Sequence, residues 1–280
     1  MTSNYSETMG NIISVQKVFK NRKVYAIRSR ESLKNAIMRQ AGMYEDLQTE
    51  VNGVAQKYAD SKINAATCKA LEGGYMSTRD MIYVRKSSIF LTDAVSCESY
   101  VNKIRVHNNM YLAQNYAEKN KINFQKESGK SGFIPYQYEF DRSLKIYSLT
   151  IDLQRVGKDE NFNCEADAQE KTDRVCSILD AVETLSLVVK GNMDNAEPVF
   201  VVGGLSDRKT HYFENVVHIK ENKLEISEEL RERVKRGYHC GLLKGNILKN
   251  QKEIEEMLDP MSVPEFFSTV KKEVEEYFTM

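Results

Sequence analysis

The sequence lacks several features that define whole classes of proteins. It has no run of about 18 or more uncharged apolar residues, so it predicts no transmembrane helix. Its start, MTSNYSE, has no basic segment followed by an apolar one, so no secretory signal is expected. The five cysteines are scattered, and no two have the Cys-x-x-Cys spacing of zinc or redox motifs. We therefore expect reduced thiols in a cytoplasmic protein without a membrane partner.

The sequence also has no net charge, because 40 Lys and Arg residues balance 40 Asp and Glu residues. This balance argues against a uniformly basic protein that coats nucleic acid, but the charges are not evenly mixed. Residues 1–40 hold eight basic and two acidic residues, and residues 101–145 hold eight and four. Residues 146–180 and 251–280 are acidic instead. This segregation fits either ordinary solvated faces or an anion-binding face on an acidic body.

Hydrophobic patterning predicts an α+β fold. Strands are expected at residues 11–19, 24–27, 81–84, 88–91, 144–153, 198–202 and 213–219. Helical spacing of apolar residues predicts helices that start at Ser29 or Ser32, that run from about residue 175 to 191, and that begin at Ser227 and at Pro264. Strands separated by helices, with hairpins attached, indicate a sheet covered by helices. A split βαβ arrangement of ferredoxin type is the simplest that fits.

Residues 28–39, RSRESLKNAIMR, form the first candidate binding site. They place hydroxyls, backbone amides and positive side chains at a helix start, where unpaired N–H groups and the helix dipole attract anions. Arg30 and Lys34 are four residues apart and share a helix face, whereas Leu33 and Ile37 face the core. The alternative is an amphipathic helix with a solvated basic side.

Residues 107–143 form the second candidate site. We expect a hairpin with arms at residues 122–124, 133–134 and 136–140 around a polar loop tip, KESGKSG, at 126–132. Lysines are mixed with aromatic residues there: Lys119, Lys121, Lys126 and Lys130 with Tyr111, Tyr116, Phe124, Phe133 and Tyr136. Single-stranded nucleic acid requires both, cations for phosphates and flat side chains for bases. The alternative is a loop whose aromatic side chains return to the core.

Patterns for catalysis are weak. Gly129-Lys130-Ser131 resembles the end of a P-loop, but Phe124 stands where that motif requires glycine. The four histidines show no HxH or HxxxH arrangement with carboxylates, and no zinc-ligand spacing. A nuclease that uses His107 or His211 as a general acid or base is an alternative, since imidazole titrates near neutral pH. We expect no catalytic residue, metal or cofactor.

Several stretches, in this order, resemble the DevR-type backbone subunits of type I-B CRISPR Cascade complexes. They are NYSE to GN at residues 4–11, VYAIRSRESLK at 24–34, IPYQYE at 134–139, KIYSLTIDL at 145–153, and then Gly191 and Gly203-Gly204. The resemblance covers nearly the whole chain and depends on the order of the motifs. The family has a strand before the Asn-Tyr-Ser segment, and here three residues precede it. Either the sequence starts late or that strand is absent, which would leave a sheet edge unpaired.

The resemblance implies an RRM-like, ferredoxin-like palm (residues 1–44 and 144–280), a fingers insertion (45–106) and a thumb hairpin (107–143). It implies that several copies stack along one CRISPR RNA with other Cascade subunits. The palm would grip the RNA backbone and each thumb would displace a base, leaving the others to pair with target DNA. By position, the resemblance assigns guide phosphates to Arg28, Ser29, Arg30, Lys34 and Arg39. The lysines and rings of residues 107–143 add Lys126, Lys130, Phe133 and Tyr136 to the predicted RNA-binding set.

The leading hypothesis is a non-catalytic backbone subunit that binds guide RNA. An RNA endonuclease of the same superfamily, processing CRISPR transcripts, is the first alternative, and a scaffold that works without nucleic acid is the second. Phosphate contacts give affinity without sequence preference, and base pairing then reads the sequence. We expect one cationic groove from Arg30 and Lys34 to the residue 107–143 hairpin. Reversing both charges is expected to weaken RNA binding and leave the fold intact.

Overall fold

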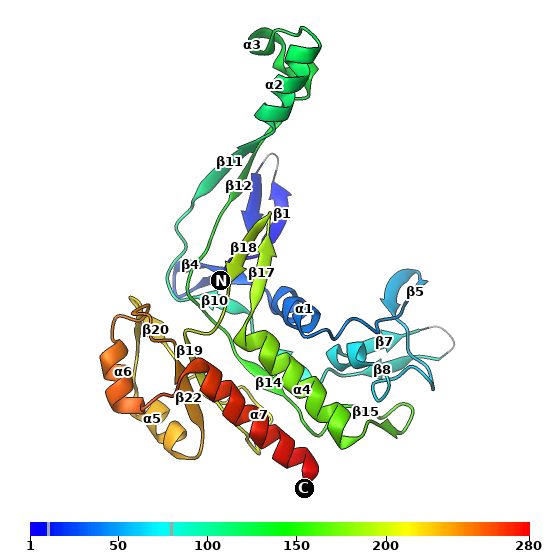
Figure 1. Cartoon of the computed structure of the whole chain (residues 1–280), viewed down its shortest axis with the longest axis vertical. Helices are drawn as coiled ribbons and strands as arrows, with labels where there is room; N and C mark the ends of the chain where they lie inside the picture. The colour runs from blue at the N-terminus through cyan, green and yellow to red at the C-terminus, as the bar shows by residue number, and fades with distance from the viewer. Residues whose placement is uncertain (10–11, 79–80) are drawn as a thin grey trace.

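The computed structural model describes residues 1–9, 12–78 and 81–280 as a wide body from which one long arm protrudes (Figure 1). The arm comprises residues 104–139, and it ends in a small helical tip far from the body. Gly10 and Asn11, which the sequence analysis used as a strand boundary and as part of a family motif, lie outside the described residues. Within the described residues, no helix has both the length and the apolar character needed to cross a membrane.

The helices lie in both the body and the arm tip. They are α1 (Arg30–Gln40), α2 (Met110–Lys119), α3 (Phe124–Glu127), α4 (Ala168–Glu183), α5 (Glu228–Lys235), α6 (Gln251–Leu258) and α7 (Val263–Thr279), with the 3-10 helices η1 (Lys69–Gly73) and η2 (Ser128–Ser131). The N-caps of α1 and α5 are Ser29 and Ser227, as predicted. Such a cap stabilises a helix by about 1 kcal/mol.

The strands are short and form many small sheets, so the fold is mixed α+β, as predicted. The arm sheet has the order β1 (Tyr5–Met9), β2 (Ile12–Val15), β12 (Pro135–Glu139), β11 (Ile104–Asn108). The body sheet has the order β13 (Lys145–Ile146), β10 (Ala94–Ser96), β4 (Lys23–Arg28), β3 (Lys17–Lys20). The two-stranded sheets are β14 (Leu149–Ile151) with β9 (Ile89–Leu91), β17 (Ser186–Val189) with β18 (Asn192–Asn195), β19 (Phe200–Gly203) with β22 (His239–Leu242), β5 (Thr49–Asn52) with β6 (Val54–Lys57), β7 (Tyr75–Ser77) with β8 (Tyr83–Arg85), β15 (Lys158–Asp159) with β16 (Cys164–Glu165), and β20 (Ile219–Lys220) with β21 (Lys223–Leu224).

The main core lies where α4 packs on α1 and on α7, and where these helices cover the strands of the body (Figure 1). Leu33 and Ile37 of α1 are buried there, as their spacing predicted, together with Phe266 and Phe267 of α7. Each such side chain contributes about 1.5–3 kcal/mol when it leaves water. This burial fixes the rotation of α1, and therefore decides which of its basic residues face outward.

The arm is built from strands that are distant in sequence. β11 and β12 are antiparallel, from Ile104 opposite Glu139 to Asn108 opposite Pro135. β12 also pairs in parallel with β2, with Tyr138 opposite Ile13. The Glu139 carboxylate accepts hydrogen bonds from the backbone N–H of Val15 and from Lys17 Nζ. The N-terminal strands therefore brace the base of the arm.

The predicted form of the residue 107–143 hairpin is wrong in detail. Its arms are β11 and β12, and residues 122–124 are not a strand. The expected loop at 126–132 is instead the end of α3 followed by η2. Alternation of apolar and polar residues in Ile122-Asn123-Phe124 suggested a strand, but the Asn123 side chain accepts a hydrogen bond from Lys126 N and caps a helical turn.

Four other predicted elements differ from the structure. The strand expected at 11–19 is divided at Gln16 into β2 and β3, which join different sheets, and the strand at 144–153 is divided into β13 and β14. The helix expected to reach residue 191 ends at Glu183, because β-branched residues before a Lys190-Gly191 turn favour the β17–β18 hairpin. Residues 213–219 are mostly turns, and α6 was not predicted.

The first residues of the chain lie beside the start of the body sheet. Met1 N donates to Ser143 O at 3.1 Å, and Ser143 N donates to Met1 O at 3.3 Å. Ser3 N donates to Asp141 O at 3.2 Å. Residues 141–143 therefore supply backbone hydrogen-bond partners to the residues that precede the Asn-Tyr-Ser segment.

Residues 45–106 are joined to the body by a buried ionic cluster. Glu72, in η1, is 1% exposed and accepts hydrogen bonds from Arg85 at 3.2 Å, Arg174 at 2.9 Å and the N–H of Gly157 at 2.6 Å. Arg174 belongs to α4, so the cluster links two parts of the fold. A buried carboxylate requires such pairing, because desolvation of a lone charge is very costly.

Candidate nucleic-acid interface

The N-terminus of α1, predicted to bind a phosphate, is occupied by groups of the protein itself. The N–H of Arg30 donates to Asp93 Oδ1 at 2.7 Å, and the N–H of Ser32 donates to Ser29 Oγ at 3.3 Å. The N–H of Ser29 donates to Asn4 Oδ1 at 2.7 Å. A carboxylate of the chain thus takes the place expected for a phosphate. This corrects the prediction of an open anion site at the helix start.

Lys34 points into the protein rather than out to solvent. Its Nζ donates to Gly73 O at 3.1 Å, Ser87 Oγ at 2.6 Å and Ile89 O at 3.0 Å, which uses all three donors of the ammonium. Burial, followed by the neighbouring charge of Lys57, lowers the pKa of Lys34 to about 8. A phosphate would have to break these bonds, so we remove Lys34 from the predicted phosphate-binding set.

Arg28 is likewise turned inward. Its side chain is buried at the end of β4, where Nη1 donates to Thr2 O at 3.2 Å. Burial lowers its pKa, and the nearby carboxylate of Asp194 opposes that shift. Arg28 is buried because strand residues alternate between faces, and the face of β4 that holds Arg28 also holds the buried Ala26. Arg28 therefore leaves the predicted set for the same reason as Lys34.

Arg30 and Arg39 are the exposed basic residues of the predicted helix. The Arg30 side chain is 65% exposed, and its Nε donates to Glu31 Oε1 at 2.7 Å. Arg39 is exposed in the last turn of α1. An exposed ion pair such as Arg30–Glu31 contributes little to stability, so Arg30 can exchange Glu31 for another anion at low cost. These two residues stay in the predicted RNA-binding set, at opposite ends of α1.

The arm tip, residues 109–134, carries the other predicted residues. Lys126 and Lys130 are exposed, although Lys130 Nζ pairs with Glu127 Oε1 at 2.5 Å. Phe133 is half-buried against Phe124, with ring centroids 5.6 Å apart in an edge-to-face arrangement. Phe133 therefore packs within the tip, as the alternative interpretation of the aromatic residues allowed.

Asn109 closes the arm tip at its neck. Its Nδ2 donates to Gly132 O at 2.7 Å, and its Oδ1 accepts from Ile134 N at 2.8 Å. Ala113 and Ala117 are buried on the inner side of α2, while Tyr111 and Leu112 are exposed. The tip is thus a small folded unit with lysines and uncovered apolar side chains on its outside. Such surfaces are typical of interaction sites.

A cluster on the β11–β12 ladder, the part of the arm between the body and the tip that we call the arm base, was not predicted as a unit. The ring of Tyr138 lies 6.0 Å from that of Tyr5, 6.3 Å from that of Tyr136 and 4.9 Å from that of His107. We call these four residues the tyrosine face. Lys190, from the turn between β17 and β18, places Nζ 4.9–5.6 Å from the centres of the three tyrosine rings.

Part of this cluster had a signal in the sequence. Tyr136 and Tyr138 are two residues apart, so they share one face of a strand. The contributions of Tyr5 and Lys190 come from pairing between distant segments, which no local pattern indicates.

Burial, reinforced by Tyr138, raises the pKa of Tyr5 to about 12, so its hydroxyl is neutral and does not repel a phosphate.

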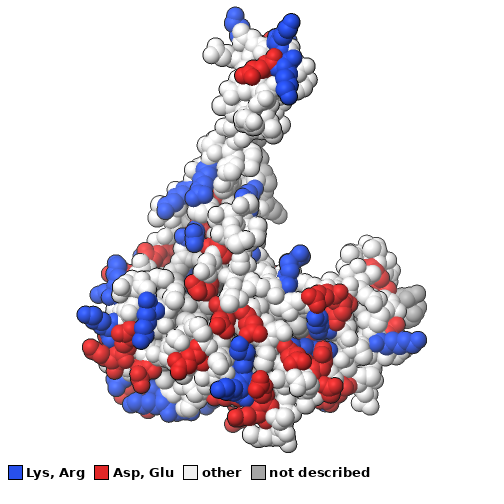
Figure 2. All heavy atoms as spheres, viewed as in Figure 1, with Lys and Arg blue, Asp and Glu red and all other residues white. Residues whose placement is uncertain are grey.

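The structure does not bring the predicted residues into one continuous groove. α1 lies in the body, and α2 and α3 lie at the far end of the arm (Figure 1). On the face shown in Figure 2, Lys and Arg side chains gather at the arm tip and again along the lower arm, with neutral side chains between. The body carries both signs of charge intermixed. The tyrosine face and Lys190 lie at the arm base, between the predicted residues of α1 and those of the arm tip.

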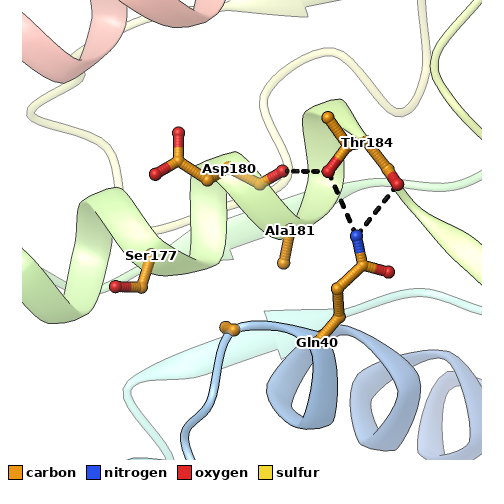
Figure 3. Close-up of a pocket in the computed structure, with 6 residues that line it drawn as sticks. Gln40, Ser177, Asp180, Ala181 and Thr184 are labelled. Atoms are coloured by element: carbon orange, nitrogen blue, oxygen red, sulfur yellow. Dashed lines mark hydrogen bonds between the residues drawn. The ribbon is translucent and has the colours of Figure 1, made fainter.

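A shallow depression of about 240 Å³ lies between the ends of α1 and α4 (Figure 3). Gln40 Nε2 donates to Thr184 O at 2.9 Å and to Thr184 Oγ1 at 3.1 Å, and Gln40 Oε1 accepts from Ser186 N at 2.9 Å. Of the other polar side chains that line it, Ser177 donates to Asp173 O and Asp180 pairs with Lys271, so each already has a partner in the protein. We interpret the depression as a joint between two helices rather than as a ligand site.

Three of the four histidines form hydrogen bonds with neighbouring side chains. His107 bonds the Tyr138 hydroxyl at 2.8 Å, His211 bonds Thr150 Oγ1 at 2.8 Å, and His239 bonds Glu273 Oε1 at 2.6 Å. In the described part of the chain, no three His, Cys, Asp or Glu side chains are grouped as a metal site would require. All five cysteines are free thiols.

Comparison with known proteins gives one family. The sequence model of the family described as CRISPR-associated negative auto-regulator DevR/Csa2 matches residues 2–228. Both parts of the predicted RNA-binding set, on α1 and on the arm, lie within the matched residues, as do the tyrosine face and Lys190. No curated protein matches the chain.

Proposed function

Because the chain belongs to the CRISPR-associated DevR/Csa2 family, as its motifs predicted, we propose that it is a backbone subunit of a type I-B Cascade complex. In this role it binds CRISPR guide RNA without cleaving it and takes part in target DNA recognition through the guide. The observation that carries the proposal is the protruding arm, which bears exposed lysines at its tip and aromatic side chains at its base. Cations and flat rings on one projection suit a single-stranded RNA.

We further propose a division of labour along the chain. Residues 1–44 and 144–280 act as an RRM-like palm, residues 45–106 as fingers, and residues 107–143 as a thumb. Of the predicted contacts, Arg30, Arg39, Lys126, Lys130 and Tyr136 have side chains that reach solvent and are the ones we retain. Ser29 supports them as the N-cap of α1, and Phe133 supports them by packing within the arm tip.

Assembly with other copies is part of the proposal. The arm tip is rich in lysine, and the segment that forms α6 and α7 is acidic. Unlike surfaces of this kind allow copies to associate head to tail into an open helical array. The partners proposed are CRISPR RNA, further copies of this chain and other Cascade subunits, in the cytoplasm.

The experiment that tests the function is binding and cleavage in one sample. Purified protein is incubated with labelled CRISPR repeat RNA, and complex formation and RNA length are followed by native and denaturing gels. We expect a complex with intact RNA at low salt, and its affinity should fall as salt rises. Specific cleavage that His107→Ala or His211→Ala abolishes would favour the endonuclease alternative, and absence of any complex would reject the proposal.

A further inference from the structure

The tyrosine face and its neighbours share one side of the arm sheet. In the β11–β12 ladder, His107 lies opposite Tyr136 and Arg105 lies opposite Tyr138. Residues opposite each other in an antiparallel pair project to the same face. Tyr5 reaches this face from β1, and its ring meets that of Tyr138 edge-on. The arm base thus presents three tyrosines, a histidine and an arginine together.

The members of this face differ in how far they are covered. Tyr138 is 4% exposed, and its hydroxyl bonds His107, so it forms the floor of the cluster. Tyr136 is 38% exposed, and His107 is also exposed, with the two ring centroids 5.6 Å apart. Parts of the Tyr136 and His107 rings therefore remain open to solvent above the buried Tyr138.

Two cations border the open rings. Lys190 contacts the tyrosines through its ammonium, and ring contacts do not neutralise its charge. Arg105 is exposed, and its guanidinium lies 3.5 Å from the centre of the Phe140 ring, which holds it in place. A ring that can stack with a base, flanked by charges that can meet phosphates, is the local arrangement used to hold single strands.

We infer that the tyrosine face is a nucleotide subsite, in which one unpaired RNA base stacks on Tyr136 beside His107 while Lys190 and Arg105 contact the adjoining phosphates. This inference rests on the proposed RNA-binding function and adds to it a defined place for a base. The subsite is independent of base identity, because every base has a flat face. It is also separate from the lysines of the arm tip, which it does not require.

The test compares tyrosines of equal exposure. Tyr277 in α7 is also 38% exposed and is the matched control for Tyr136. Affinity for a fluorescein-labelled single-stranded RNA is measured by anisotropy for Tyr136→Ala, Tyr136→Phe and Tyr277→Ala. We expect Tyr136→Ala to bind about tenfold more weakly, and the other two variants to stay within about twofold of the wild type.

A second substrate separates stacking from general damage. With an abasic RNA of the same length, the difference between wild type and Tyr136→Ala should disappear. Lys190→Gln should lower the slope of log affinity against log salt by about 0.7. Photo-crosslinking of 4-thiouridine RNA to the wild-type protein should label the peptide that contains Tyr136 or the one that contains His107. This last measurement needs no variant and so does not depend on one that folds.

The two proposals fail in different ways. If the wild-type protein binds no RNA, the proposed function is wrong. If the wild type binds RNA but Tyr136→Ala binds equally well, or if crosslinks fall only outside the arm base, the subsite alone is rejected. A changed oligomeric state of RNA-free Tyr136→Ala with unchanged affinity would also reject it and would assign the face to contacts between copies.

Discussion

At the scale of single residues, burial decides which basic side chains can meet an anion. Periodicity places Arg30 and Lys34 on one face of α1, but it does not reveal what covers that face. The segment around η1 and β9 covers Lys34 and supplies three acceptors, while Arg30 stays open. The sequence therefore predicted the helix, its cap and its buried stripe, but not the difference between these two cations.

Replacement of Lys34 is expected to harm the fold rather than RNA binding. Lys34→Met leaves Gly73 O, Ser87 Oγ and Ile89 O without this donor and should lower the free energy of unfolding by about 2 kcal/mol. Arg30→Met, on the same helix face but exposed, should change it by less than about 0.5 kcal/mol. Urea denaturation measures both. Equal stability of the two variants would contradict the internal role of Lys34, and the double charge reversal at Arg30 and Lys34 is no longer expected to leave the fold intact.

The pH dependence of stability gives an independent check on Lys34. Its pKa is about 8 in the folded protein, below the ordinary value of 10.5, so the unfolded chain binds this proton more tightly. Its contribution to stability therefore rises between about pH 8 and 10.5 and is lower at neutral pH. The stability difference between wild type and Lys34→Met should widen over this range. A difference that is constant with pH would contradict the lowered pKa.

At the scale of elements, the fold depends on joints between segments that are distant in sequence. The Glu72 cluster joins η1 to α4, and Gln40 joins the end of α1 to the start of β17. Local patterns located most helices and several strands, because apolar spacing and caps are local signals. They did not locate the breaks at Gln16 or at Tyr147-Ser148, where one apparent strand passes from one sheet to another.

Loss of the Glu72 charge is expected to destabilise this joint. Glu72→Gln leaves Arg85 and Arg174 buried without their counter-ion and should lower the free energy of unfolding by about 3–5 kcal/mol. Glu170→Gln is the matched control, since Glu170 pairs with the same Arg174 at 2.7 Å but is 45% exposed. This control should cost less than about 1 kcal/mol. Thermal melting of both variants compares the two losses of stability. Similar melting temperatures for Glu72→Gln and Glu170→Gln would contradict the prediction.

At the scale of the whole molecule, the arm carries lysines and rings away from a body of mixed charge (Figure 2). The candidate site could be predicted in part, since the lysines of the arm tip and Tyr136 are evident in the sequence. Sequence patterns could not show whether one groove joins α1 to the arm, because the distance between them depends on how far the folded arm extends. Tyr5 and Lys190 escaped prediction because only the folded chain brings them to Tyr138.

Removal of the arm tip is expected to separate folding from RNA binding. An Asn-Gly turn in place of residues 109–134 joins Asn108 to Pro135, which already face each other in the ladder. The body should keep its melting temperature, because its core lies elsewhere. RNA affinity at low salt should fall, and the salt slope should decrease by as much as about 3 as four lysines are lost. Unchanged slope and affinity would remove the tip from the RNA interface.

RNA-dependent assembly is the corresponding prediction for the intact chain. Addition of a guide-length RNA should shift the protein from one copy to several per particle in gel filtration with light scattering. The particles should dissociate as salt rises, because phosphate contacts are screened. An elution volume that RNA does not change would favour a scaffold that works without nucleic acid.

The parallel pairing of β2 with β12 also sets an order of events during translation. Val15 and Glu139, which bond each other at the arm base, are 124 residues apart. At about 5–20 residues per second, the ribosome needs roughly 6 to 25 seconds to deliver the partner of the N-terminal strands. For that interval the nascent chain displays β1 and β2 with an unclaimed edge, so chaperones that shield such edges have their longest opportunity at the very beginning of synthesis.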